Sequence, residues 1–239
     1  MLKALFDTWR SRKSERELYD EFVEMLEMCW AVFEMVAEVL SGKVCAETVE
    51  DDLLVRDIAI NRKERAIRRR LVEHVSLHSG GAVTTSLILM SVVKDAERIG
   101  DYCKNLLEVA QMMNKPAKEL EFYQDIVDVG FQVTQNFRRT LSAFTDGDEE
   151  LAREIIEDET LINKRSDRLI ERISQSDLHA REAVPTALWV RFLKRINAHL
   201  SNICSSLVLP VHRIDYRLTY EKEKSAAGRA EGKVDDSDQ

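Results

Sequence analysis

Residues 94–105 read Lys-Asp-Ala-Glu-Arg-Ile-Gly-Asp-Tyr-Cys-Lys-Asn, and residues 191–202 read Arg-Phe-Leu-Lys-Arg-Ile-Asn-Ala-His-Leu-Ser-Asn. The second sequence is an altered copy of the first, and Arg98 recurs as Arg195 at a separation of 97 positions (195 − 98). An internal repeat usually marks two copies of one structural unit. We therefore predict a fold built from two similar units.

The composition favours a few long helices. Glycine and proline, which most often form turns, number only 8 and 3 among 239 residues, and this argues against a many-stranded β protein. The formal net charge is −8, and such an acidic balance disfavours nucleic acid as a partner. The four cysteines form no Cys-x-x-Cys pair, so neither a structural zinc site nor a disulfide framework is expected.

Apolar residues recur at helical spacing in six long runs. The runs cover about residues 14–40, 46–77, 82–114, 117–144, 149–174 and 181–218. Pro210 lies inside the last run and predicts a kink or an early end of that helix. The predicted fold is all-α, with six long helices arranged as two tandem three-helix antiparallel bundles.

The predicted helices divide the chain into four segments. They are an N-terminal segment (1–13), a first three-helix unit (14–115), a second three-helix unit (116–220) and a disordered polar tail (221–239). Neither a signal peptide nor a membrane span is expected, since the longest uncharged stretch contains a Gly-Gly turn. The sequence therefore predicts a cytoplasmic protein.

The first copy resembles the signature of a known family. Asp95-Ala-Glu-Arg-Ile-Gly-Asp101, in the third helix of a three-helix unit, is similar to the PhoU signature, and residues 192–202 resemble the same signature with substitutions. The resemblance implies a cytoplasmic two-repeat bundle, often dimeric. It also implies a regulator of phosphate uptake that acts on a membrane phosphate transporter or its sensor kinase. Association with the membrane would then be peripheral and occur only through such a partner.

The resemblance also implies a metal in one unit. Some PhoU-like proteins carry iron or zinc clusters on the acidic faces of their signatures, and Glu97 and Asp101 match that acidic pair. At the equivalent places in the second copy, Lys194 and Ala198 cannot serve as ligands. The expected cofactor is therefore a divalent or ferric ion (iron, zinc or magnesium) in the first unit only.

Further oxygen donors are expected beside this pair. Folding the third helix back on the second predicts that Glu97 lies near Glu64, and that Asp101 lies near Asn61 and Asp57. Clustered carboxylates suit oxygen-preferring cations. The alternative is a solvated acidic face whose carboxylates pair with neighbouring arginines: Arg98, Arg65 or Arg62.

The second helix carries a basic run that includes Arg62, Arg65, Arg68 and Arg69. Arginine forks bind carboxylates and phosphates, so these four residues are the candidate contacts for an acidic protein partner. A solvated helix face, with arginine stems covering apolar surface, is the alternative interpretation.

Nothing in the sequence predicts catalysis, because it contains no Ser/His/Asp arrangement and no glycine-rich phosphate loop. The predicted function is non-catalytic regulation of phosphate uptake or phosphate signalling. Two alternatives stay open: a metal-binding helical bundle that acts as a sensor, and a regulatory subunit of a sodium–phosphate or potassium transport system.

Overall fold

The computed structural model describes residues 13–77, 81–113, 115–209, 212 and 214. These residues form helices and no strand, which confirms the all-α prediction. The long helices are α2 (Lys13–Leu40), α3 (Ala46–Leu77), α4 (Gly81–Met112), α5 (Tyr123–Asp146), α6 (Glu149–Ser174) and α7 (Ala180–Val208); a short 3₁₀ turn, η1 (Ala117–Glu119), precedes α5. The predicted N-terminal segment, except residue 13, and the predicted polar tail lie outside the described residues.

Two predicted helix boundaries are wrong by more than two residues. The helix expected to begin at Ala117 begins at Tyr123, because Leu120 is extended (φ −71°, ψ 140°) and its side chain turns into the core. The helix expected to run to residue 218 ends at Val208, and Leu209 is extended (φ −109°, ψ 144°). A residue before proline is disfavoured in the helical region, so this is the early end that Pro210 predicted.

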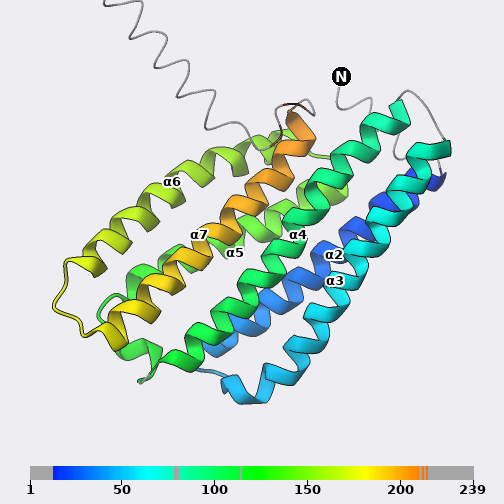
Figure 1. Cartoon of the computed structure of the whole chain (residues 1–239). Helices are drawn as coiled ribbons and strands as arrows, with labels where there is room; N and C mark the ends of the chain where they lie inside the picture. Colours follow the sequence, from blue (N-terminus) through cyan, green and yellow to red (C-terminus); the bar gives the residue numbers. More distant parts are fainter. Residues whose placement is uncertain (1–12, 78–80, 114, 210–211, 213, 215–239) are drawn as a thin grey trace, which may run out of the picture.

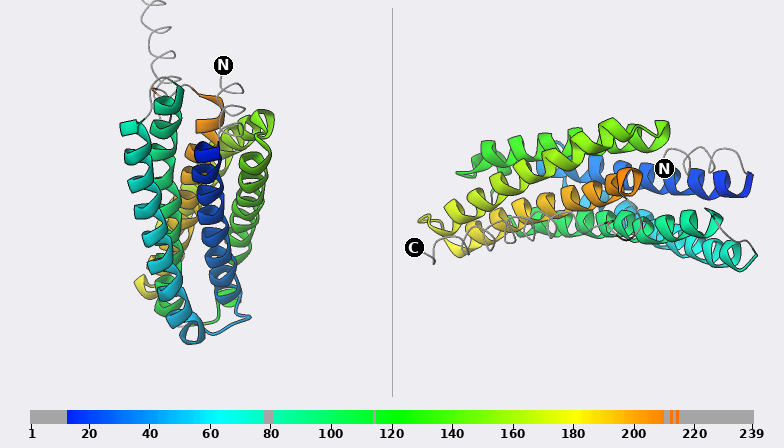
Figure 2. Two further views of the ribbon diagram at one scale, coloured as in Figure 1. Left: turned by 90° about the vertical axis from the view of Figure 1, so that its right-hand side faces the viewer. Right: turned by 90° about the horizontal axis from the view of Figure 1, so that it is seen from above.

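The helices form two antiparallel three-helix units that lie side by side (Figures 1 and 2). The first unit contains α2, α3 and α4, and the second contains α5, α6 and α7. Helix α4 packs against α7 and α2 packs against α5, while α3 and α6 lie at opposite outer edges. The central helices therefore join the units, and the two outer helices are free to present one face each to other molecules.

The buried positions repeat from one unit to the other. Ile60 of α3 corresponds to Ile162 of α6, and Ile99 of α4 corresponds to Ile196 of α7; all four side chains are buried. Aromatic rings continue the core across the junction, since the ring of Phe137 lies 5.6 Å from that of Phe33 on α2. The two units thus share one apolar core.

Candidate functional site

The close packing of α3 on α4 positions the acidic cluster. Gly100 of α4 faces Ile60 of α3 at close range, since a Cβ atom added at Gly100 would lie 3.4 Å from Cδ1 of Ile60, at van der Waals contact. One turn away, Asp57 and Asn61 of α3 face Asp101 of α4 across this contact. The packing of α4 on α3 therefore brings the oxygen donors of the two helices together.

Lys104 lies between the two aspartates of this cluster. Its Nζ is 3.4 Å from Oδ2 of Asp57 and 3.5 Å from Oδ1 of Asp101. Nδ2 of Asn61 donates to Oδ2 of Asp57 at 3.3 Å. Burial acts to lower the pKa of Lys104, but the charges of the two aspartates outweigh it and raise that pKa. Lys104 is thus an internal cation of the cluster, a role that the sequence analysis missed.

The surroundings of Glu97 oppose its ionisation. Burial and the neighbouring charges of Asp101, Glu64 and Asp57 raise the pKa of Glu97, and Arg98 opposes them. Nε of Arg98 lies 3.6 Å from Oε2 of Glu97, and its Nη1 donates to Asp101 at 3.1 Å. The charge of Glu64, which the sequence placed near Glu97, therefore acts on Glu97 in the structure. Arg98 pairs with these carboxylates, as the alternative interpretation of a solvated acidic face expects.

The described residues do not fit a preformed metal site. Besides Lys104 and Arg98, which bind the aspartates, Nη1 of Arg68 donates to Oε1 of Glu64 at 2.9 Å. Within the part of the chain that the structure describes, no three His, Cys, Asp or Glu side chains are placed to hold one metal ion. The carboxylates are instead paired with the chain's own cations, and the metal site stays a prediction.

Replacing Glu97 with glutamine should stabilise the protein at neutral pH. Because the folded-state pKa of Glu97 is raised, ionisation of this group opposes folding at high pH, and the penalty disappears below its unfolded pKa of about 4.3. We expect Glu97→Gln to raise the free energy of unfolding by about 0.2–0.5 kcal/mol at pH 7, as for like charges four residues apart, and to change it little at about pH 3.5. Urea unfolding with a chelator present measures this, with the exposed Glu73→Gln as control. A loss of stability at pH 7 would contradict it.

The second unit keeps only part of this arrangement. Glu159 of α6 stands in place of Asp57; it accepts hydrogen bonds from Nδ2 of Asn163 at 2.9 Å and from Oγ of Ser201 at 3.1 Å. Lys194 pairs with Asp167. Only one of the equivalent positions, that of Glu159, is acidic, so the carboxylate cluster belongs to the first unit.

A second polar cluster lies between α4 and α7, where the sequence analysis predicted no site. Oδ1 of Asp95 is 2.6 Å from Nδ1 of His199 and accepts a hydrogen bond from Nδ2 of Asn202 at 3.0 Å. The ring of Tyr102 stacks on His199 with centroids 5.6 Å apart. One signal was available: the second copy has Phe192 in place of Asp95, and a carboxylate at an apolar position needs a partner.

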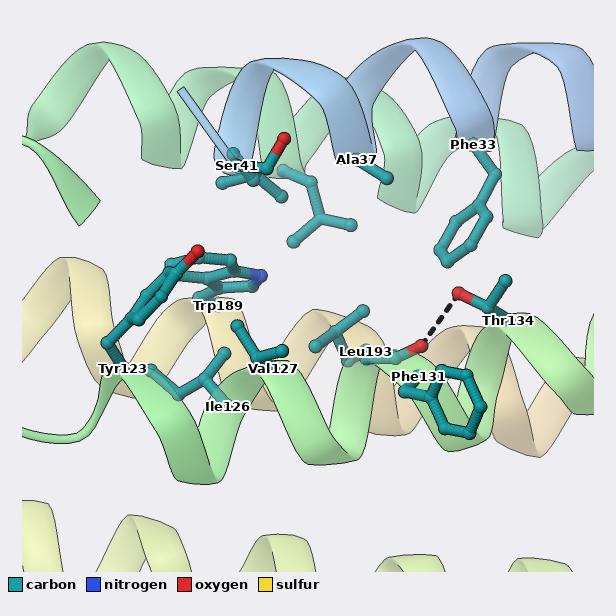
Figure 3. A pocket seen from close by; sticks show the side chains of 13 residues that line it. Phe33, Ala37, Ser41, Tyr123, Ile126, Val127, Phe131, Thr134, Trp189 and Leu193 are labelled. Carbon is teal, nitrogen blue, oxygen red and sulfur yellow. Dashed lines mark hydrogen bonds between the residues drawn. The ribbon is translucent and has the colours of Figure 1, made fainter. Parts of the chain in front are cut away.

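An apolar pocket of about 250 Å³ opens between α2 and α5, with α7 behind it (Figure 3). Phe33, Tyr123 and Trp189 line it together with aliphatic side chains. The hydroxyl of Thr134 donates to the carbonyl of Gly130 at 2.8 Å, and that of Ser41, just after α2, donates to the carbonyl of Glu38 at 2.9 Å. The pocket therefore offers van der Waals contact and little polar recognition.

The four arginines of the basic run divide into two groups. Arg62, Arg65 and Arg69 point outward from α3, at the edge of the molecule, whereas Arg68 is bound to Glu64 of the acidic cluster. Arg65 donates to the carbonyl of Asn61 on its own helix at 3.1 Å. The structure thus separates three outward arginines from one that belongs to the cluster.

Only one of the four cysteines should react quickly in the folded protein. Burial raises the pKa of Cys29 and Cys204 to about 12, and it also raises the pKa of Cys103. Cys45 is exposed. Because the thiolate is the reactive form, a thiol reagent such as dithionitrobenzoate should titrate one thiol in buffer and all four in denaturant. Two or more fast thiols in buffer would show that the buried ones are accessible.

Comparisons with known proteins agree with the fold and with the signature. The PhoU domain model matches residues 22–110 and 126–207. A phosphate-specific transport system accessory protein PhoU homolog of Pseudomonas putida is 25% identical over 234 residues, which cover 92% of this chain and 91% of that protein. PhoU homolog 1 of Thermotoga maritima, also a phosphate-specific transport system accessory protein, is 21% identical over 201 residues, covering 81% and 87%.

Solved structures show the same architecture. The regulatory protein PhoU of the phosphate transport system of Streptococcus pneumoniae superposes with a TM-score of 0.73 at 19% identity, covering 81% of this chain and 92% of that one. PhoU of Pseudomonas aeruginosa superposes with a TM-score of 0.74 at 18% identity, covering 83% and 97%. Since the domain model matches both three-helix units over most of their length, this chain belongs to the PhoU family.

Proposed function

We propose that the chain is a non-catalytic, cytoplasmic regulator of phosphate uptake that works by contact with a membrane phosphate transporter or with its sensor kinase. The observation that carries this proposal is the match of the PhoU domain to both units, together with relatives named as accessory proteins of phosphate transport. A bundle with an extended surface and outward basic residues suits regulation by contact.

Two features of the chain support a role without catalysis. The carboxylates of the first unit are paired with Lys104 and Arg98, so they are held as a charge-balanced cluster. In the apolar pocket, the hydroxyls of Thr134 and Ser41 donate to backbone carbonyls. No helix of the described residues is long and apolar enough to cross a membrane.

Copurification tests the proposal. The tagged full chain is recovered from membranes of its native cell, grown in high and in low phosphate, and the proteins that accompany it are identified. We expect a phosphate transporter or its sensor kinase, with a recovery that depends on the phosphate supply. A potassium or sodium–phosphate transport system would instead establish the alternative regulatory role. Absence of any membrane partner in both conditions would overturn the proposal.

A metal sensor in the first unit is the second candidate, because the charges of Asp101, Glu64 and Asp57 all act to raise the pKa of Glu97. A bound cation would have to displace Lys104 and Arg98 from the two aspartates. Metal analysis of the protein purified without chelator, beside the Glu97→Ala/Asp101→Ala variant, tests it. Metal that is present in the wild type and lost in the variant would support a sensor. A metal content equal in both proteins would refute this site.

A further inference from the structure

The outward face of α3 carries a continuous stripe of side chains. Its members are separated alternately by three and four residues, which is the spacing of the contact seam in a coiled coil. Side chains at this spacing lie in one line along a helix, and the line spans about 25 Å. We call it the α3 stripe; its members are Val55, Ile58, Arg62, Arg65, Arg69 and Val72.

The ends of the α3 stripe expose aliphatic side chains. Val55 is 64% exposed, Ile58 41% and Val72 59%. The opposite face of α3 is also apolar, since Ile60 and Ile67 are buried in the core. A helix that only had to pack within its own unit would need one apolar face. The aliphatic side chains at the ends of the stripe are therefore not needed for packing within the first unit.

The centre of the α3 stripe carries positive charge that the structure does not balance. The described residues provide no ion pair or hydrogen-bond partner for the guanidinium groups of Arg62 and Arg69. Arg65 is bonded only to the carbonyl of Asn61. In a chain with a net charge of −8, three outward arginines in one line are available to acidic groups of another molecule.

The second unit shows that the fold does not require such a stripe. The buried residues of α3 and α6 correspond at a separation of 102 positions, as Ile60 and Ile162 do. At the same separation, the α3 stripe corresponds to six residues of α6 that include no aliphatic side chain. These residues are Glu157, Thr160, Lys164, Asp167, Glu171 and Ser174.

We propose that the α3 stripe is the docking surface for an acidic amphipathic helix of the partner protein. Carboxylates in the middle turns of that helix would face Arg62, Arg65 and Arg69, and aliphatic side chains at its ends would cover Val55 and Val72. The proposal rests on the proposed function and names the chemistry of the contact. Charge complementarity selects this partner, and the aliphatic ends set its register.

Two other occupants fit the α3 stripe less well. A second copy of the chain that used the same stripe would bring the arginines of both copies together, and like charges at an interface oppose binding. An anionic membrane would meet Asp51 and Glu73, which are exposed on the same side of α3. A basic membrane-binding helix also keeps its arginines on the face opposite its apolar side chains, whereas in the α3 stripe arginines and aliphatic side chains share one face.

Photo-crosslinking in the native cell tests the proposal. The full chain carries the photoreactive p-benzoylphenylalanine in place of Val55 or Val72, and control chains carry it in place of Glu157 or Ser174 of α6. We expect crosslinks from α3 to a segment of the copurifying membrane transporter or kinase in which carboxylates recur at heptad spacing. Arg62→Glu/Arg65→Glu/Arg69→Glu should lower the yield by at least about tenfold, because it turns attraction into repulsion. Lys164→Glu/Asp167→Lys/Glu171→Lys, the matched change on α6, should leave the yield unchanged.

Several outcomes would show that the α3 stripe is not a helix-docking surface. These outcomes are crosslinks to a segment without carboxylates, crosslinks to a second copy, and equal yields from α3 and α6. The proposal is also overturned if the wild type sediments with phosphatidylglycerol vesicles and the α3 charge reversal abolishes this sedimentation. If the transporter or kinase copurifies but α3 gives no crosslink, the stripe fails and the proposed function stands. If the wild type copurifies with no membrane partner, the proposed function itself fails.

Discussion

Replacing Phe137 with alanine is expected to lower the free energy of unfolding by about 3–5 kcal/mol, the usual cost of deleting a buried phenylalanine ring. The ring of Phe137 is fully buried and lies 5.2 Å from that of Trp30 and 5.6 Å from that of Phe33. These contacts join α5 to α2, so the cavity opens at the junction of the two units. Urea unfolding followed by circular dichroism measures the loss.

The matched control for this prediction is Phe131→Ala. Phe131 lies on the same helix but is exposed, so its removal should change the free energy of unfolding by no more than about 0.5 kcal/mol. A cost below about 1 kcal/mol for Phe137→Ala would contradict the tight aromatic packing between the units. If two separate transitions appeared in the variant, the junction would be the element that makes the units unfold together.

The second large effect is expected at the polar cluster between α4 and α7. Asp95→Ala removes the acceptor for both His199 and Asn202, and these groups lie in a largely buried place. Leaving a buried donor unpaired costs about 1–3 kcal/mol, and we expect a destabilisation of this size. Urea unfolding at pH 7 measures it.

Asp95→Asn is the conservative control, because its carbonyl oxygen still accepts a hydrogen bond. It should retain most of the stability that Asp95→Ala loses. A double-mutant cycle with His199→Ala separates the direct interaction, which we expect to be about 0.5–3 kcal/mol, from the effect of truncation. An interaction energy near zero would show that the two side chains do not stabilise one another across the junction.

Much of the architecture was predictable because it depends on local spacing. Burial of Ile60, Ile162, Ile99 and Ile196 follows the helical period of the sequence, and the predicted all-α fold is confirmed. The start of α5 was not predictable in this way, because Leu120 leaves the helical conformation in order to pack into the core. Periodicity reports the face of a helix but not the tertiary contacts that decide where the helix begins.

The sequence was enough to predict which carboxylates lie close together in the first unit, but not which cation lies between them. Folding α4 on α3 was enough to place Glu97 and Asp101 near Glu64 and Asp57, whose charges act together in the structure. The position of Lys104 between two aspartates depends on side-chain reach across the helix contact, and the sequence analysis left it out. The presence of a metal at these acids stays a prediction that metal analysis decides.

The sequence by itself determined the repeat, the helical class and the family, because each of these depends only on the spacing and the type of residues along single helices. Only the tertiary structure decided which charges meet. Lys104 reaches Asp57 across 47 positions of the chain, and His199 reaches Asp95 across 104. Such pairs depend on the crossing and the register of packed helices, and no local pattern carries that information. The tertiary structure also showed which face of α3 stays uncovered, because burial of one face by neighbouring helices leaves the opposite stripe to solvent.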